Sequence, residues 1–142
     1  FLCGTDMMLT LGDAYTMSND SANALLAYMN LFNQHKGKVL YSARACQAIM
    51  EIFWKRNNPV QGDRLQKGFQ NSDRWTAWNT GVLYVELIRR SGVEAKLAAE
   101  ERDEFNKVVS MVHNYGTDPA VMKEDKDNKA FKNAVQSSKK KK

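Results

Sequence analysis

The side chains best suited to covalent chemistry in this sequence are its two cysteines and two histidines. Cys46 paired with His35 or His113 would be a nucleophile, because a neighbouring base favours the thiolate. Cys46, however, falls among the apolar positions of an expected helix, which favours a buried free thiol. Cys3 and Cys46 allow one disulfide at most, and their spacing matches no zinc or CxxC redox motif.

Carboxylates are concentrated at Glu100, Glu101, Asp103 and Glu104. Paired carboxylates perform acid–base catalysis when their surroundings separate their pKa values. An exposed helix supplies no such difference, so we interpret the run as a solvated helix face. Neither histidine has a metal-ligating partner four residues on, and the sequence has no GxSxG, P-loop, GxGxxG or HExxH motif. We therefore expect no enzymatic activity, no catalytic residue, no metal and no cofactor.

The composition is that of one soluble domain. The chain has 142 residues, 43% of them hydrophobic and 26% charged, which suits a single globular core. With 8 glycines and only 2 prolines, it favours long helices over a loop-rich or β-sandwich fold. The longest apolar run, at residues 82–85, is far shorter than the ~20 residues of a membrane-spanning helix.

Helical periodicity predicts an all-α, single-domain bundle of about four to five helices. We expect helices from the capping residues 18–21 to about residue 35, and over 38–57, 72–90 and 93–115. Residues 1–116 then form the bundle, and 117–142 form a polar, lysine-rich C-terminal tail for which the pattern allows a frayed helix or none. The first dozen residues are not assigned. Asn19-Asp20-Ser21 is a glycosylation sequon, but we favour its interpretation as a polar helix start.

Positive charge is concentrated at the C-terminal end. Residues 1–116 have 13 Lys+Arg and 12 Asp+Glu, a net charge of +1, whereas residues 117–142 have 8 lysines and 4 acids, a net charge of +4. Lys139, Lys140, Lys141 and Lys142 end the sequence. A near-neutral body with a basic tail indicates either attraction to an anionic surface or a solubilising tail.

Two expected helices have more apolar surface than one core contact needs. In the helix over 38–57, apolar side chains cover an arc of roughly 240°, against the ~100° that seats a surface helix. In the helix over 72–90, Leu83 and Leu87 lie on a different side from Trp75. Either both helices are central, or part of this surface stays in water as a membrane or protein contact.

Cations adjoin two of the tryptophans. Lys55 and Arg56 follow Trp54, and Arg74 precedes Trp75, which is the composition of a helix at a membrane interface. The candidate membrane- or partner-binding residues are therefore Trp54, Lys55, Arg56, Arg74, Trp75, Leu83, Leu87, Lys139, Lys140, Lys141 and Lys142.

The middle of the chain also carries a recognisable pattern of motifs. Lys38-Val39-Leu40-Tyr41 opens a long helix, and Pro59-Val60-Gln61-Gly62-Asp63 follows where that helix ends. A further helix begins near Arg74-Trp75 and ends before Ser91-Gly92-Val93. This region, residues 38–93, resembles the sperm acrosomal protein family of abalone, which comprises lysin and its fusagenic eighteen-kilodalton paralogue.

The resemblance implies a secreted, lysin-like helical bundle that is released from the sperm acrosome and acts at the egg surface without enzymatic chemistry. A start at Phe1-Leu2-Cys3 is what removal of a signal peptide would leave, although a fragment boundary would look the same. Within the family, lysin opens the egg envelope by binding its glycoprotein through tracks of Lys and Arg, whereas the paralogue is implicated in membrane fusion. The near-neutral body is closer to the paralogue.

The expected partner is therefore an anionic lipid membrane surface, and the expected function is fusion of the sperm and egg plasma membranes. Bridging two bilayers requires contact surfaces at both ends of the bundle or self-association. The alternative is a lysin-like protein that binds an egg-envelope glycoprotein. We expect no nucleic-acid partner, because no helix of the body has clustered basic residues.

Overall fold

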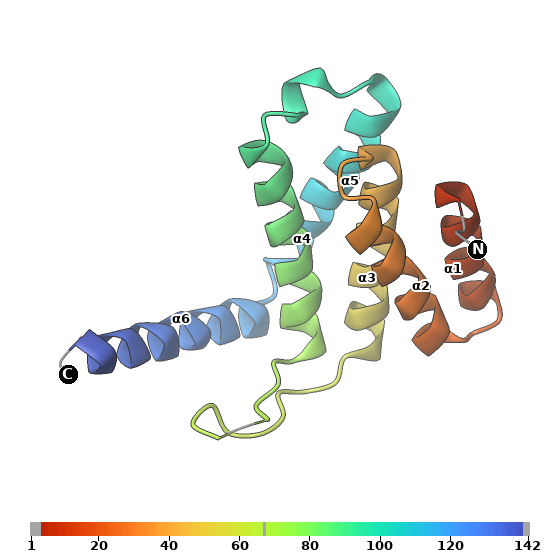
Figure 1. The fold of residues 1–142 in the computed structure, drawn as a ribbon. Coiled ribbons are helices and arrows are strands. Elements are labelled where there is room, and N and C mark those ends of the chain that lie inside the picture. Colours follow the sequence, from red (N-terminus) through yellow and green to blue (C-terminus); the bar gives the residue numbers. More distant parts are fainter. Residues whose placement is uncertain (1–3, 67, 141–142) are drawn as a thin grey trace.

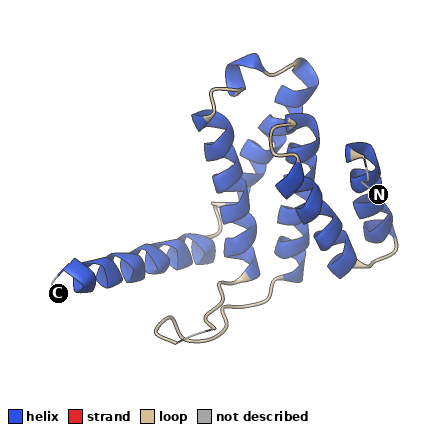
Figure 2. Ribbon diagram, in the orientation of Figure 1, coloured by secondary structure: helices blue, strands red, loops and turns tan. Residues whose placement is uncertain are grey.

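The computed structural model describes residues 4–66 and 68–140, and within them the protein is an all-helical bundle. The elements, in chain order, are α1 (Thr5–Met17), α2 (Ser21–Gln34), α3 (Val39–Arg56), α4 (Asp73–Arg90), the short 3-10 helix η1 (Glu94–Lys96), α5 (Ala99–Tyr115) and α6 (Pro119–Lys140). Figure 2 shows helices joined by short loops, apart from one long loop between α3 and α4. The predicted fold class is confirmed.

The predicted helix boundaries are confirmed where capping residues mark them. The Asp20 carboxylate accepts a hydrogen bond from the Asn23 amide and starts α2, which confirms the polar-helix-start interpretation of this segment. Ser72 caps α4 in the same way, through the Trp75 amide. Asn57 ends α3 in the left-handed conformation, two residues before Pro59.

Three elements differ from the sequence-based expectation. The unassigned N-terminal segment contains α1, and the tail, for which the pattern allows a frayed helix or none, forms the long helix α6. The single helix expected over 93–115 is divided, because Leu97 and Ala98 are extended. Leu97 is buried, and the Ala98 amide is bonded to the Glu101 carboxylate, so this break fills the core and caps α5.

Helix α3 is the centre of the bundle. Its residues Val39, Ala43, Cys46 and Met50 belong to a core cluster shared with α4 and α5. A second cluster joins its other side to α2, and partly buried side chains of α1 pack against that cluster. The wide apolar arc of α3 is therefore explained by neighbours on two sides, which confirms the central-helix interpretation for this helix.

Helix α4 combines a tightly packed face with an exposed one. Ala77, Gly81, Tyr84 and Ile88 are buried against α3 and α5. At Gly81 the helices approach so closely that an added Cβ would lie 2.5 Å from atoms of Met50 and Val112. The opposite side of α4 leaves two leucines in solvent.

The bundle has helices projecting on opposite sides. Figure 1 shows α3, α4 and α5 running side by side, with α1 at one edge of the molecule and α6 extending away from the other. The described residues contain no helix long and apolar enough to cross a membrane.

Candidate functional site

Trp54 is partly buried and packs between α4 and α5. Its ring stacks on Tyr115 of α5 with a centroid separation of 4.0 Å and an interplanar angle of 12°. The Arg74 guanidinium lies 4.5 Å from the centroid of the same ring, a cation–π contact between α3 and α4. These contacts give Trp54 a structural role between α3, α4 and α5, and its expected place at a lipid headgroup stays a prediction.

Arg56 and Asp73 form an ion pair that fixes the end of α3 to the start of α4. The guanidinium donates two hydrogen bonds, from Nε to Oδ2 at 2.8 Å and from Nη2 to Oδ1 at 2.9 Å. The Asn58 amide donates a third bond to the same carboxylate at 2.8 Å. The bonds from Arg56, with that from Asn58, hold the pKa of the buried Asp73 carboxyl below its usual value. Arg56 thus has a structural partner, whereas its neighbour Lys55 is exposed.

Arg74 and Trp75 connect α4 to α6. Arg74 forms an ion pair with Asp118 at 3.4 Å, and the Trp75 indole donates from Nε1 to Asp125 at 3.2 Å. Both residues therefore position the C-terminal helix. Trp75 is half-buried, and its expected place at a membrane surface stays a prediction.

Polar side chains complete the docking of α6. The buried Glu124 accepts hydrogen bonds from the backbone amide and the hydroxyl of Ser72. Asn128 donates to Asn71 at 2.8 Å and accepts from Arg64 at 3.3 Å. These contacts fix the first half of α6 against the start of α4 and the loop that precedes it.

The second half of α6 extends beyond these contacts (Figure 1). Its docked face contains Val121, Glu124 and Asn128, and the same three-and-four spacing continues through Phe131 and Val135. Phe131 is half-buried, and the Val135 side chain is 37% exposed. We call residues 129–140 the distal segment of α6.

The distal segment is strongly basic. It contains Lys129, Lys132, Lys139 and Lys140, and the sequence has no acidic residue after Asp127. Lys129 is paired with Asp125 at 3.0 Å, while the side chains of Lys132 and Lys139 are exposed. Of the predicted terminal lysines, Lys141 and Lys142, together with the Lys140 side chain, lie outside the described residues. The distal segment thus combines two apolar side chains with a basic helix surface.

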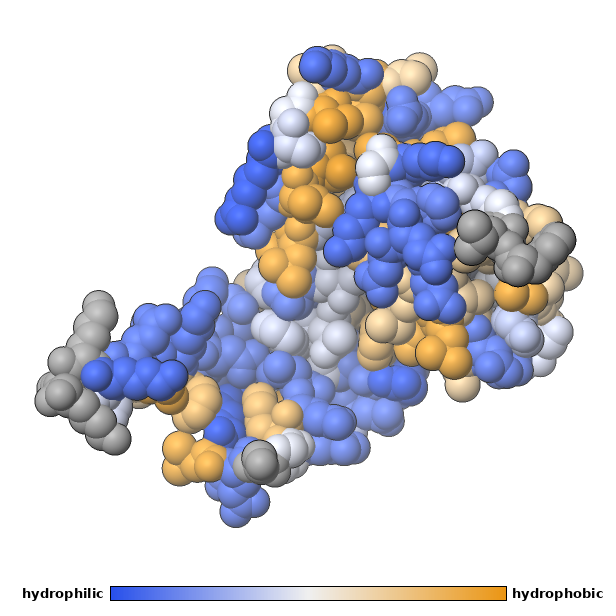
Figure 3. All heavy atoms as spheres, viewed as in Figure 1, coloured by the Kyte–Doolittle hydropathy of each residue, from blue (hydrophilic) through white to orange (hydrophobic). Residues whose placement is uncertain are grey.

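Leu83 and Leu87 form a separate apolar strip on α4. Their side chains are 56% and 41% exposed, and they lie one helical turn apart. Figure 3 shows hydrophobic side chains gathered along the upper part of α4 on the face in view. The exposed-surface interpretation thus applies to this helix, although the role of the two leucines as a binding site stays a prediction.

The loop between α3 and α4 also exposes apolar side chains, and the sequence analysis does not predict it as a candidate site. At its tip, Leu65 is 84% exposed, and the neighbouring Arg64 lies over the Phe69 ring and reaches Asn128 of α6. Figure 3 shows hydrophobic atoms beside this loop and below α6. The loop therefore contacts α6 at Asn128, the residue that precedes the distal segment. The sequence signal for its exposed apolar tip is Leu65 within a polar turn.

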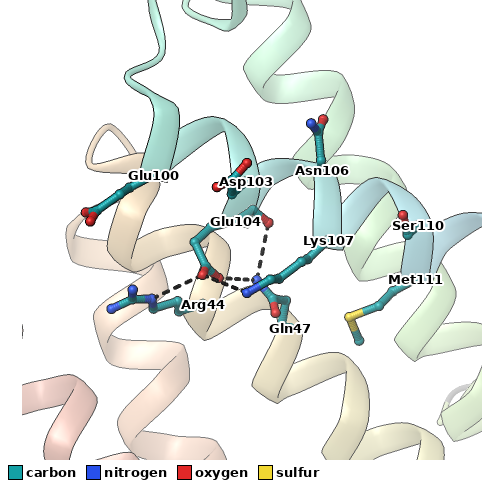
Figure 4. A pocket seen from close by; sticks show the side chains of 9 residues that line it. All are labelled: Arg44, Gln47, Glu100, Asp103, Glu104, Asn106, Lys107, Ser110 and Met111. Atoms are coloured by element: carbon teal, nitrogen blue, oxygen red, sulfur yellow. Dashed lines mark hydrogen bonds and ion pairs between the residues drawn. The ribbon is translucent and has the colours of Figure 1, made fainter.

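The carboxylate run on α5 is only partly solvated, which corrects the expectation for Glu104. Figure 4 shows its carboxylate meeting side chains of α3. It accepts hydrogen bonds from Gln47 at 2.9 Å and from Lys107 at 3.0 Å, and Arg44 lies 3.6 Å away. Burial acts to raise the pKa of Glu104, but the bonds from Gln47 and Lys107 outweigh it and leave the pKa lowered.

The groove around Glu104 is an open space of about 630 Å³ between α3 and α5. Glu100 and Asp103 line it and point away from the Glu104 network in Figure 4. A carboxylate whose charge is stabilised by three neighbours is a poor proton donor at neutral pH, so the arrangement joins two helices and does not resemble an acid–base pair.

Cys46 is a buried free thiol, as the sequence predicts. Burial raises the pKa of the thiol, which disfavours the nucleophilic thiolate. The other cysteine, Cys3, lies outside the described residues. Within residues 4–66 and 68–140, no cluster of three His, Cys, Asp or Glu side chains is arranged to hold a metal ion.

The comparisons with known proteins found no match: no family model, no curated protein and no solved structure is similar to this chain. The resemblance to the abalone sperm proteins therefore stays a prediction from the sequence.

Proposed function

We propose that this protein is a secreted sperm acrosomal protein that binds and perturbs membranes and so promotes fusion of the sperm and egg plasma membranes, without enzymatic chemistry. The observation that carries the membrane part of this proposal is the distal segment of α6. It is a basic helix that leaves the bundle with Phe131 and Val135 on one face. Basic amphipathic helices of this kind bind at the lipid headgroup boundary.

Electrostatic attraction brings the distal segment to an anionic bilayer. Each lysine near such a surface contributes ~1 kcal/mol at most, and residues 129–142 contain six lysines and no acid. This attraction is weakened by salt, because exposed charges more than a Debye length apart are screened.

Apolar side chains then enter the headgroup boundary. Val135 and the edge of Phe131 are available on α6, and Leu65 adds an apolar side chain from the adjacent loop. Burial of their exposed area contributes ~25 cal/mol per Å². Insertion of a helix and a loop on one side of a bilayer expands that leaflet, which is the perturbation that the proposal requires.

Trp54, Arg56, Arg74 and Trp75 have a supporting role in this mechanism. Arg74 and Trp75 hold α6 through Asp118 and Asp125. Arg56 fixes the start of α4 through Asp73, and Trp54 packs against Tyr115 and Arg74. The proposal thereby assigns the membrane contact to the C-terminal end of the molecule, which Arg74 and Trp75 position directly.

The test is lipid mixing between fluorescently labelled vesicles, compared for anionic and neutral lipid. We expect mixing by the full chain in anionic vesicles and its loss in the double variant Phe131→Ser, Val135→Ser. The matched control is Leu83→Ser, Leu87→Ser, which removes two exposed leucines from α4 and should keep the activity. A chain ending at Ser138 should bind less, most clearly at low salt, because four lysines are removed.

Far-UV circular dichroism of each variant shows whether the helices persist. An effect on mixing in a variant with unchanged helix content is then due to the loss of its apolar side chains. The absence of mixing in both lipids would contradict the proposal and favour the lysin-like alternative, binding of an egg-envelope glycoprotein. Loss of mixing in the α4 control alone would place the lipid contact on Leu83 and Leu87 and exclude α6 as the membrane-binding element.

A further inference from the structure

The turn between α1 and α2 presents two polar side chains that the fold does not use. Ser18 and Asn19 form this turn, and Asn19 has a left-handed backbone, with a φ of 59°. Asn19 and Ser21 are exposed. Neither of these two side chains has a hydrogen-bond partner among the described residues, although the neighbouring Ser18 and Asp20 side chains do.

The start of α2 depends on Asp20 alone. Its carboxylate accepts hydrogen bonds from the Asn23 backbone amide at 3.2 Å and from the Asn23 side chain at 2.7 Å. The left-handed backbone explains an asparagine at position 19, because asparagine tolerates a positive φ better than most residues. Neither the turn nor the cap requires a hydroxyl group at position 21.

Asn19, Asp20 and Ser21 together match the acceptor motif for N-linked glycosylation, in which any residue except proline separates asparagine from serine or threonine. No other asparagine in the sequence is followed two positions later by serine or threonine. An N-linked glycan is bulky and has to lie on the surface of the folded protein. The exposed turn between α1 and α2 meets this requirement.

The space next to the turn can accommodate the first sugars of a glycan. Asn19 and Ser21 line an open groove of about 830 Å³ between the α1–α2 hairpin and α3. Asp13, Thr16 and Gln47 also line this groove, and their polar side chains are suited to hydrogen bonds with sugar hydroxyls. Figure 1 shows the turn at the edge of the molecule away from α6, so a glycan at this position leaves the distal segment of α6 free.

We infer that Asn19 is a glycosylation site and carries an N-linked oligosaccharide, an inference that rests on the secretion included in the proposed function. The donor is an oligosaccharide joined to a lipid diphosphate, and an oligosaccharyltransferase of the secretory pathway catalyses the transfer. The Nδ2 nitrogen of Asn19 forms a bond to the anomeric carbon of the first sugar, and the bond between that carbon and the diphosphate oxygen breaks. The lipid diphosphate leaves with the electron pair of the broken bond, and the nitrogen loses one proton.

Two substitutions of Ser21 form a matched test. The full chain is secreted from vertebrate cells behind a cleavable signal peptide, as the parent and as the variants S21A and S21T. We expect the intact masses of the parent and S21T to exceed that of the bare chain by whole numbers of hexose and N-acetylhexosamine units. S21A keeps Asn19 but lacks the hydroxyl that the motif requires, so this mass excess should be lost. A further variant, Asn19→Asp, keeps a residue that tolerates positive φ and should lose the excess as well.

Peptide N-glycosidase F identifies the modified residue, because it releases the glycan and converts the asparagine that carried it into aspartate. Digestion in heavy-oxygen water should place one ¹⁸O atom at position 19 of the parent and of S21T, and none in S21A. The circular dichroism of S21A and S21T should match that of the enzymatically deglycosylated parent, because the exposed Ser21 side chain has no hydrogen-bond partner among the described residues.

A secreted parent chain with the mass of the bare sequence would overturn the inference, and so would a glycan that S21A retains. Lipid mixing by the same secreted parent separates this inference from the proposed function. A parent that lacks the glycan but mixes vesicles contradicts the glycosylation site alone. A glycosylated parent that causes no mixing, before or after removal of the glycan, contradicts the proposed membrane activity alone.

Discussion

The replacement of Asp73 by asparagine tests how the protein holds its C-terminal surface in position. Asp73 is only 5% exposed and accepts three hydrogen bonds, two from Arg56 and one from the Asn58 amide. The D73N side chain keeps one acceptor oxygen but turns an NH₂ group toward donors. It also removes a negative charge from the first turn of α4, where the helix dipole favours one.

The size of the effect follows from the exposure of the two partners. Breaking a fully buried pair costs about 3–5 kcal/mol, and an exposed pair contributes about 0.2–1 kcal/mol. The Asp73 side chain is 8% exposed and that of Arg56 is 46% exposed, so the pair lies between these limits. We expect D73N to lower the free energy of unfolding by about 2 kcal/mol, which corresponds to a decrease in Tm of roughly 8 °C.

The effect depends on pH in a defined direction. The pKa of Asp73 in the folded protein is lowered, chiefly by the hydrogen bonds from Arg56, below the value of about 3.9 in the unfolded chain. The carboxylate therefore stabilises the fold above pH ~4, and this contribution is lost as the pH falls through the lowered pKa. The difference in the free energy of unfolding between the parent and D73N should have its full size at pH 7 and should decrease below pH ~4.

The assay is urea unfolding followed by circular dichroism at several pH values. Glu86→Gln is the matched control, because Glu86 pairs with Arg90 at 3.7 Å on the exposed side of α4. We expect it to change stability by less than about 0.5 kcal/mol. A D73N protein as stable as the control, or one whose deficit is the same at pH 3 and pH 7, would refute the reasoning.

Three further predictions concern the interior: two substitutions and the reactivity of one thiol. Gly81→Ala should destabilise the protein by about 1–3 kcal/mol in urea unfolding, because its Cβ would lie 2.5 Å from atoms of Met50 and Val112, and a neutral or stabilising result would contradict this packing. Glu104→Gln should lower stability more at pH 7 than at pH 3, since the pKa of Glu104 is lowered by its hydrogen bonds and only the charged form makes them fully; equal deficits at both pH values would be unexpected. Cys46 should resist a thiol reagent in the folded protein and react once urea unfolds it, and rapid reaction in native buffer would show that its site is open.

The sequence predicts the central helices well because the residues that end each helix are its neighbours in the sequence. Ser72 caps α4, and Pro59 prevents helical continuation after α3, so a few neighbouring residues decide each boundary. Helix α1 is not predictable in this way, because it lacks a side-chain N-cap and contains Gly12, whose small size serves contact with Tyr28 of α2. The role of Gly12 can be deduced only once the position of α2 is known.

The candidate surface could be predicted only in part. A tryptophan beside cations has the same sequence pattern whether its ring lies at a membrane or packs within a protein. The environment of Trp54 depends on its contacts with Tyr115 and Arg74, which are distant in the sequence. The direction of α6 likewise depends on polar pairs between residues far apart in the sequence, such as Trp75 with Asp125. The basic character of the C-terminal end is a matter of composition, so the sequence shows it directly.

The most direct test of the central claim is the environment of position 135 when the protein meets a bilayer. An environment-sensitive fluorophore is attached through Val135→Cys in a chain with Cys3→Ser; the buried Cys46 is left in place. A second chain carries the label through Leu83→Cys. We predict that anionic vesicles brighten the label at 135 and that spin-labelled lipid quenches it, while the label at 83 changes little. An unchanged label at 135 in the presence of bound vesicles would contradict the claim that the distal segment of α6 enters the membrane.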